Sequence, residues 1–171
     1  MEHEYRFKVV VVGEEAVGKT SLILRYVENT FEGDYIPTLG VNFVVKDLPD
    51  MSTRLVIWDI GGQNMWKAKL NLYLKGSDGA IIIFDVTRPV TFGTLDTWIS
   101  KLQQQLDPQF PYVVVGNKTD LQDLRKVQEA HAHKFLKNKR HSIYFEASAK
   151  TGKNVEDLFR RIADELIKLQ Q

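Results

Sequence analysis

The residues from Gly13 to Thr20 have the types and spacing of a loop that binds nucleotide phosphates. They fit the pattern G-x-x-x-x-G-K-[ST] and lie between an apolar run and an amphipathic one. Glycines let backbone N–H groups surround a β-phosphate, the Lys19 ammonium can reach β and γ oxygens, and the Thr20 hydroxyl can bind Mg²⁺. The alternative interpretation is a glycine turn that opens an ordinary helix. The predicted phosphate-binding residues are Gly13, Glu14, Glu15, Ala16, Val17, Gly18, Lys19, Thr20 and Ser21.

A second polar segment could surround a γ-phosphate. Asp59 follows the apolar run Leu55–Trp58, where a parallel sheet presents ligand groups, and it can hold Mg²⁺ through a water. Gly62 can offer a backbone N–H to the γ-phosphate, and the amide of Gln63 can orient an attacking water, so Gln63 and Lys19 are the candidate catalytic residues. The alternative is that the glycines form a plain turn and Gln63 is a solvated loop residue.

A third polar segment, from Tyr35 to Gly40, has a stiff proline before Thr38. The Thr38 hydroxyl could complete a near-octahedral Mg²⁺ shell, and we expect the loop to become ordered only with a γ-phosphate. We include Tyr35 and Thr38 among the nucleotide-binding residues.

Asn117, Lys118 and Asp120 follow another buried run and could read a purine base. The Asp120 carboxylate can accept two hydrogen bonds from guanine, whereas adenine offers no such pair of donors. We expect Lys118 to lie along the base and Asn117 to brace neighbouring loops. A surface turn is the alternative, since turns favour these residue types. The further residues predicted to contact the nucleotide on this side are Leu121, Ser148, Ala149 and Lys150.

The elements that must position these residues alternate between short apolar runs and longer amphipathic ones. Phe7–Val12, Ala80–Asp85 and Tyr112–Val115 are expected to be strands buried on both faces, which predicts a parallel sheet covered by helices. A hairpin of Val41–Leu48 and Thr53–Trp58 would add one antiparallel edge. The predicted helices are Lys19–Glu28, Met65–Leu74, Thr91–Gln105, Val127–Lys139 and an apolar-faced segment from Val155 to Leu169 that Asn154 could cap.

Composition excludes several classes of function. The chain has 171 residues, enough for one domain, and its 23 Lys and Arg nearly balance 22 Asp and Glu, so its net field cannot gather nucleic acid or anionic lipid. It has no cysteine, which excludes disulfides, thiolate metal sites and lipidated cysteines within these residues. The longest apolar run, Ala80–Phe84, is too short to cross a bilayer. We expect a soluble, cytoplasmic monomer.

Taken together, these motifs resemble those of a Ras-superfamily small GTPase, from Phe7 to about Leu169. The segment Asp34–Phe43, with Trp58 and Tyr73, is similar to the Rab branch. The resemblance implies an α/β P-loop NTPase fold over residues 1–171 as one G domain, with a mostly parallel six-stranded sheet, one antiparallel edge strand and about five helices. It also implies bound GTP or GDP with Mg²⁺, and Phe31 packed on the guanine. Two switch regions, 31–41 and 60–75, would meet exchange factors, activating proteins and effectors, with Phe43, Trp58 and Tyr73 forming an effector surface. Without the resemblance, these aromatic residues would be assigned to the core.

Three features depart from the Rab pattern. The segment Asp59–Gln63 carries a double glycine closer to that of Arf proteins. Glu15 replaces a small or short polar residue, and its charge either hinders an incoming arginine or points to solvent. The sequence also lacks the cysteine-bearing tail of most Rabs, so membrane contact would need a missing tail or a partner.

The expected activity is that of a GTP-binding switch in membrane trafficking or signalling that slowly hydrolyses GTP. The segment 31–40 has no arginine to act in cis, so a partner's arginine should accelerate the reaction. The alternatives are a GTP-dependent scaffold with negligible hydrolysis and, less well supported, a nucleoside kinase. The basic cluster at 137–141 is expected to be a solvated helix end rather than a nucleic-acid site. His131 and His133 are expected to be surface residues.

Overall fold

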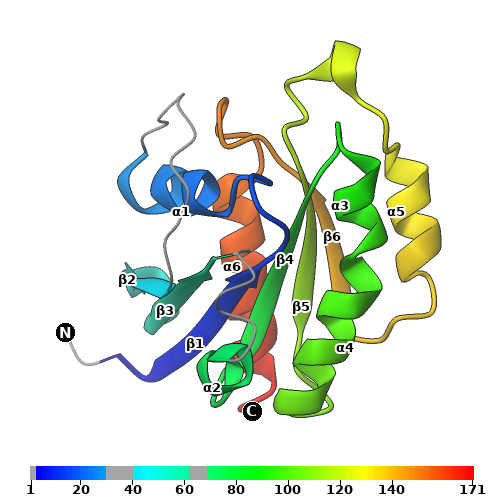
Figure 1. The fold of residues 1–171 in the computed structure, drawn as a ribbon. Coiled ribbons are helices and arrows are strands. Elements are labelled where there is room, and N and C mark those ends of the chain that lie inside the picture. Colours follow the sequence, from blue (N-terminus) through cyan, green and yellow to red (C-terminus); the bar gives the residue numbers. More distant parts are fainter. Residues whose placement is uncertain (1–2, 30–40, 62–68) are drawn as a thin grey trace.

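The computed structural model describes residues 3–29, 41–61 and 69–171. Its centre is a six-stranded sheet with the strand order β2-β3-β1-β4-β5-β6 (Figure 1). The hairpin pair β2 and β3 is antiparallel, and all other neighbouring strands are parallel. The α/β fold predicted from the sequence, with its antiparallel edge strand, is therefore confirmed. The strands are β1 (Tyr5–Val12), β2 (Val41–Leu48), β3 (Thr53–Ile60), β4 (Gly79–Asp85), β5 (Tyr112–Asn117) and β6 (Ser142–Glu146).

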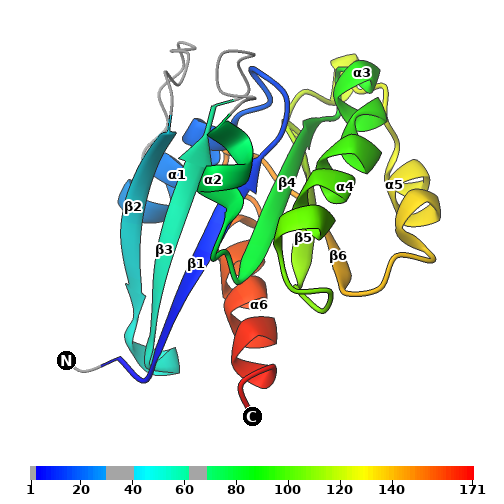
Figure 2. The same ribbon diagram turned by 60° about the horizontal axis from the view of Figure 1, so that its bottom comes forward.

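Helices cover both faces of the sheet, which explains why its central strands are continuous apolar runs (Figure 2). Alternate residues of β1, β4 and β5 pack against α1 and α6 on one face, and the intervening residues pack against α2, α4 and α5 on the other. Tyr26 of α1 stacks on Phe159 of α6, with ring centroids 4.0 Å apart. The helices are α1 (Lys19–Glu28), α2 (Leu70–Leu74), α3 (Pro89–Gly93), α4 (Leu95–Gln105), α5 (Glu129–Leu136) and α6 (Val155–Lys168), with 3₁₀ turns η1 (Pro49–Met51) and η3 (Gln122–Leu124).

Most predicted boundaries lie within two residues of those in the structure. The helix predicted over Thr91–Gln105 is divided at Thr94 into α3, which starts at Pro89, and α4. Strand β3 extends to Ile60, because backbone pairing with β1 and β2 continues past the apolar run. Asn154 occupies the N-cap position of α6, as predicted, but its side chain makes no capping bond and instead donates from Nδ2 to the carbonyl of Glu146 at 2.7 Å.

One predicted helix is shorter than expected, and another is described only in part. Helix α5 covers only Glu129–Leu136 of the predicted 127–139 segment, and residues 65–68 of the helix predicted to end at Leu74 lie outside the described residues. The apolar stripe of α6 is buried as expected through Leu166, whereas Leu169 beyond it is 47% exposed. In the described part of the chain, no helix has the length and apolar character needed to span a membrane.

Candidate nucleotide-binding site

The loop between β1 and α1 has a backbone that only glycine can adopt at two positions. Gly13 has φ +149°, and a Cβ there would lie 2.3 Å from the carbonyl oxygen of Ile83. Gly18 has φ +100°, and its Cβ would lie 2.3 Å from the Asn117 amide nitrogen. The loop thus approaches β4 and β5 more closely than any side chain would permit. Such close approach creates the cradle of backbone N–H groups at a helix start that suits a phosphate.

Lys19 starts α1 and bends back over this loop. Its Nζ donates to the carbonyls of Gly13 at 3.0 Å and Glu14 at 2.8 Å, and the residue is 6% exposed. Burial lowers the pKa of Lys19 to about 8, and the negative charges of Asp59, Glu14 and Glu15 only partly oppose that shift. The site therefore contains a desolvated ammonium, which an anionic ligand would stabilise.

Two of the three candidate metal ligands, Thr20 and Asp59, belong to the described residues, and their side chains are in contact. Thr20 Oγ1 donates to Asp59 Oδ2 at 2.6 Å, and Asp59 is 5% exposed within β3. In the described residues, no group of three or more His, Cys, Asp or Glu side chains could hold a metal ion. A hydroxyl and one carboxylate fit Mg²⁺, which takes few protein ligands and completes its shell with water and phosphate oxygens.

The loops after β5 and β6 are joined to the phosphate loop by Asn117, which is 1% exposed. Its Nδ2 donates to the carbonyl of Val17 at 2.9 Å, and its Oδ1 accepts the N–H of Ala149 at 3.3 Å. Ser148 Oγ donates to Asp120 Oδ1 at 2.7 Å. Within the described residues, Oδ2 of the half-buried Asp120 accepts no hydrogen bond. Asp120 therefore keeps acceptor capacity for a base.

Asp85 is a supporting residue that the sequence reasoning missed. It is the last residue of β4 and 1% exposed, with Oδ2 2.9 Å from Lys118 Nζ. Its Oδ1 accepts the N–H and hydroxyl of Thr87 at 2.8 and 2.6 Å. Lys118 Nζ also donates to the carbonyl of Ala16 at 2.8 Å, so it spans from β4 to the phosphate loop. The signal was present, since Asp59 and Asn117 also lie toward the carboxyl ends of strands.

Arg25 of α1 fastens the loop after β6. Its Nε donates to the carbonyl of Ala149 at 2.7 Å, and its Nη2 donates to that of Lys150 at 2.6 Å. These bonds connect the helix that starts at the phosphate loop with a loop predicted to contact the base. Nothing in the sequence pattern indicated this role, because Arg25 resembles any other cation on an amphipathic helix.

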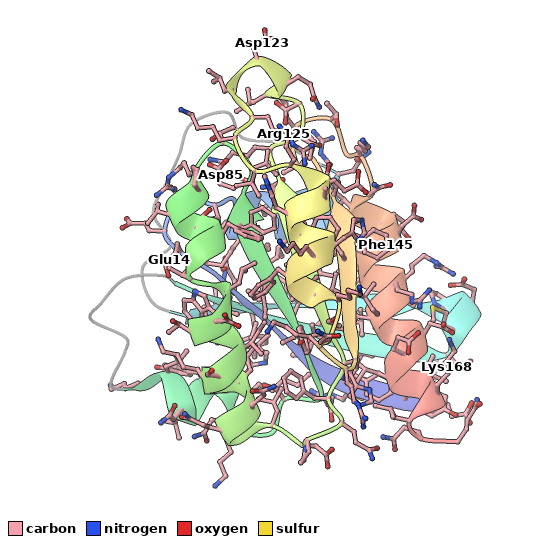
Figure 3. All side chains as sticks on the ribbon, turned by 90° about the vertical axis from the view of Figure 1, so that its right-hand side faces the viewer. Glu14, Asp85, Asp123, Arg125, Phe145 and Lys168 are labelled. Atoms are coloured by element: carbon pink, nitrogen blue, oxygen red, sulfur yellow. The ribbon has the colours of Figure 1, made fainter. Side chains whose placement is uncertain are left out.

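The two glutamates of the phosphate loop have different surroundings. Trp98 Nε1 of α4 donates to Glu14 Oε1 at 3.1 Å, whereas Glu15 is exposed and its carbonyl accepts from Arg88 Nη1 at 3.0 Å. Figure 3 shows Glu14 and Asp85 away from Lys168, which lies near the C-terminus. The phosphate loop is thus held from α4 and from the start of α3.

The three aromatic residues of the predicted effector surface share one face of the β2–β3 hairpin and α2. Phe43 is 56% exposed and stacks on the partly buried Trp58, with centroids 5.4 Å apart. Lys8 lies 4.5 Å from the centre of the Trp58 ring and donates from Nζ to the carbonyl of Tyr73 at 2.6 Å. Phe43 is therefore not a core residue, which the composition-based alternative would have required.

Several predicted site residues remain predictions. Some belong to the described part of the chain without a contact that defines their role: Ser21, Leu121 and Lys150 lie on the partly buried or exposed surface around these loops. His131 and His133 are exposed, as expected. The predicted residues outside the described part are Phe31, Tyr35, Thr38, Gly62 and Gln63.

Comparison with known proteins agrees with this geometry. The model of the Ras family matches residues 8–168. The chain is 37% identical to Ras-related protein RABA1c of Arabidopsis thaliana over 96% of its own length and 77% of that protein. It is also 37% identical to Ras-related protein Rab-7a of Paramecium octaurelia, covering 92% and 79%, and to human Ras-related protein Rab-22A, covering 91% and 81%. The chain therefore belongs to the Ras family of small GTPases, near its Rab branch.

Proposed function

We propose that this protein is a Mg²⁺-dependent switch that binds GTP and hydrolyses it to GDP and phosphate. The observation that carries the proposal is the pair of bonds made by Asn117, which joins the phosphate loop to the loop after β6. These bonds bring a desolvated ammonium, Lys19, and an available carboxylate oxygen, Asp120, to one edge of the sheet. The Lys19 ammonium suits a nucleotide's phosphates, and the Asp120 carboxylate suits the donors of guanine.

The proposed chemistry depends on positioning and charge rather than on a covalent intermediate. Lys19 would hold the β and γ oxygens and balance the charge that develops on them. Gln63 would orient the attacking water, and Thr38 and Gly62 would sense the γ-phosphate. Thr20, Thr38 and, through a water, Asp59 would hold Mg²⁺, which when bound neutralises phosphate charge. With no arginine in 31–40, unaided turnover should be slow, and a partner's arginine should accelerate it by about 10³ to 10⁵.

The proposed biological setting is intracellular membrane trafficking, supported by the Rab names of the relatives. Effectors would bind the surface formed by Phe43, Trp58 and Tyr73, and exchange factors and activating proteins would bind the switch regions. The exposure of Phe43 and its stacking on Trp58 favour such a surface, because a large exposed aromatic ring gains by burial against a partner. We expect a cytoplasmic monomer, a single G domain that reaches membranes peripherally through a tail or a partner.

The test is to purify the chain with Mg²⁺, identify the nucleotide that copurifies, and measure GDP, GTP and ATP binding by calorimetry. Guanine nucleotides should bind more tightly than ATP, and Asp120→Ala should remove that preference while Asp123→Ala, an exposed carboxylate on η3, should not. Multiple-turnover phosphate release should be lost in Gln63→Leu. No heat with GDP or GTP would refute the proposal, and GTP binding without phosphate release would favour the alternative of a GTP-dependent scaffold with negligible hydrolysis.

A further inference from the structure

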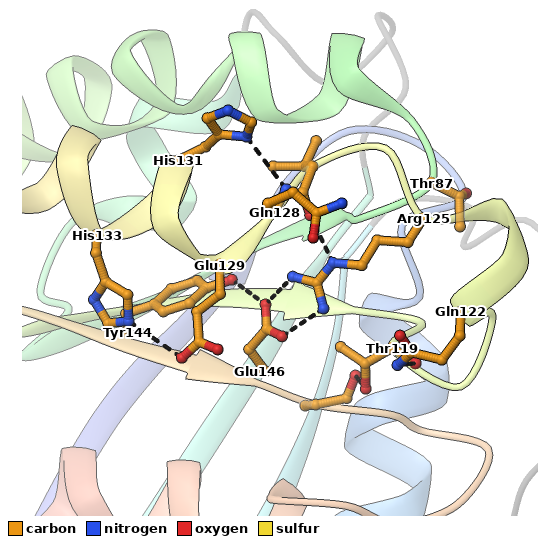
Figure 4. Close-up of polar contacts among 12 residues, drawn as sticks. Thr87, Thr119, Gln122, Arg125, Gln128, Glu129, His131, His133, Tyr144 and Glu146 are labelled. Carbon is orange, nitrogen blue, oxygen red and sulfur yellow. Dashed lines mark hydrogen bonds and ion pairs between the residues drawn. The ribbon is translucent and has the colours of Figure 1, made fainter.

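A nearly buried ion pair joins Glu146, the last residue of β6, to Arg125, which directly follows η3 on the loop after β5 (Figure 4). The guanidinium of Arg125 donates twice to Glu146, with Nη1 2.7 Å from Oε1 and Nη2 2.6 Å from Oε2. The two side chains are only 11% and 13% exposed. Because a bidentate pair fixes the planes of both groups, it sets the spacing of the segments that carry them.

Both partners are anchored close to residues proposed to read the base. Arg125 follows Asp120 on the same loop, and its Nε donates to the carbonyl of Val127 at 2.8 Å. Glu146 ends β6 and is followed closely by Ser148, whose hydroxyl donates to Asp120 at 2.7 Å. The ion pair and the Ser148–Asp120 bond therefore connect the same two segments of the chain at two separate points.

Tyr144 connects this pair to the strand that carries Asn117. Its hydroxyl donates to Glu146 Oε2 at 2.6 Å. The same hydroxyl lies 2.7 Å from where a Cβ on Gly116 would be, so β5 packs directly on it just before Asn117. We call Arg125, Tyr144 and Glu146 the Arg125 cluster. It lies against β5 at Gly116, and it includes the last residue of β6 and the residue that follows η3.

The cluster differs from the surface ion pairs of this protein. Burial acts to raise the pKa of Glu146, but the hydrogen bonds from Arg125 and Tyr144 outweigh it and hold the pKa below its usual value. The pair Arg54–Asp47 on the β2–β3 hairpin has similar bidentate geometry, at 2.7 and 3.0 Å, but is 39% and 41% exposed. Water screens that pair, so it can fix little.

We propose that the Arg125 cluster positions the Asp120 loop against the Ser148 loop, and so sets both the lifetime of the bound guanine nucleotide and the selection for guanine's exocyclic amine. Arg125, Tyr144 and Glu146 would be positioning residues without touching the nucleotide. The orientation of the Asp120 carboxylate depends on Ser148, and the distance between their loops depends on the cluster. The inference rests on the proposed GTP-binding function.

The test measures GDP dissociation and the ratio of GDP to inosine diphosphate affinities in Arg125→Lys. Inosine diphosphate lacks the exocyclic amine, so this ratio reports how well Asp120 is aligned. Lysine keeps the charge but cannot make the planar contact. By analogy with outer-shell residues of metal sites, where loss costs roughly 10- to 100-fold, we expect GDP to leave about tenfold faster and the affinity ratio to fall severalfold.

Two further variants complete the experiment: one is a control, and the other is a second test of the same cluster. Arg54→Lys changes the exposed pair of matched geometry at the other edge of the sheet, and it should alter neither quantity. Tyr144→Phe removes one donor and keeps the ring, so it tests the same proposal if Arg125→Lys does not fold. An unchanged dissociation rate in the folded variants would overturn the inference, as would faster dissociation with an unchanged affinity ratio, which would indicate a merely structural role. Failure of the unmodified protein to bind GDP would instead refute the proposed function.

Discussion

The candidate site has a phosphate end and a base end, and the two differ in whether backbone or side-chain atoms form the essential contacts. At the phosphate end, the decisive atoms belong to the backbone, and Gly13 and Gly18 are required because β4 and β5 leave no room for a side chain. At the base end, side chains do the connecting, through Asn117, Asp85 with Lys118, and Arg125 with Glu146. The phosphate end should therefore tolerate almost no added volume, whereas the base end should lose function gradually as individual contacts are removed.

The most severe test of this contrast is Gly13→Ala. The new Cβ would meet a backbone carbonyl of β4 at 2.3 Å, and neither the strand nor the +149° φ can adjust without strain. We expect a loss of about 3 kcal/mol in the free energy of unfolding and a fall in GDP affinity of about 100-fold or more. Chemical denaturation and calorimetry measure the two quantities.

Gly93→Ala is the matched control for that variant. Gly93 ends α3, and a Cβ there would have no neighbour within 4 Å. GDP affinity should remain unchanged and stability should not fall. If Gly13→Ala bound GDP as well as Gly93→Ala does, the phosphate end would not depend on close backbone approach.

The same contrast explains what the sequence could predict. The phosphate loop depends on a contiguous motif between a buried strand and a helix, so Gly13, Lys19 and Thr20 could be recognised from local pattern alone. The fold followed for a similar reason, because strands buried on both faces have a distinctive apolar pattern. The contacts of Asp85 with Lys118 and of Arg125 with Glu146 join residues far apart in the chain. The sequence could place Asp85 at the carboxyl end of a strand, but it could not show either pairing, which depends on which strands lie side by side.

A second test uses pH to examine the buried ammonium of Lys19 at the phosphate end. Burial lowers the pKa of Lys19 to about 8 in the protein alone, and an anionic diphosphate should raise it by favouring the charged form. The complex then holds more protons than the free protein above pH 8, so affinity must fall as pH rises. We expect the Kd for GDP to increase about tenfold between pH 7 and 9, measured by calorimetry at constant ionic strength.

Lys19→Arg is the control for the pH test. Arginine stays charged throughout this range, so this contribution to the pH dependence should vanish even if GDP binds more weakly overall. Ionisation of the guanine itself affects both proteins equally and cancels in the comparison. An equal slope in both proteins would show that Lys19 is not the group that titrates.

The mildest test addresses the base end through Asp85→Asn. The change removes the negative charge 2.9 Å from Lys118 but keeps an oxygen for Thr87 and leaves the Lys118 bond to Ala16 available. Because Lys118 keeps part of its support, we expect about a fivefold loss of GDP affinity, which corresponds to about 1 kcal/mol. The control is Asp96→Asn. The Asp96 carboxylate is 69% exposed and pairs with Lys139, so its loss should not change GDP affinity. A loss as large as that of Gly13→Ala would mean that the base end is as intolerant as the phosphate end, and the distinction between backbone and side-chain construction would fail.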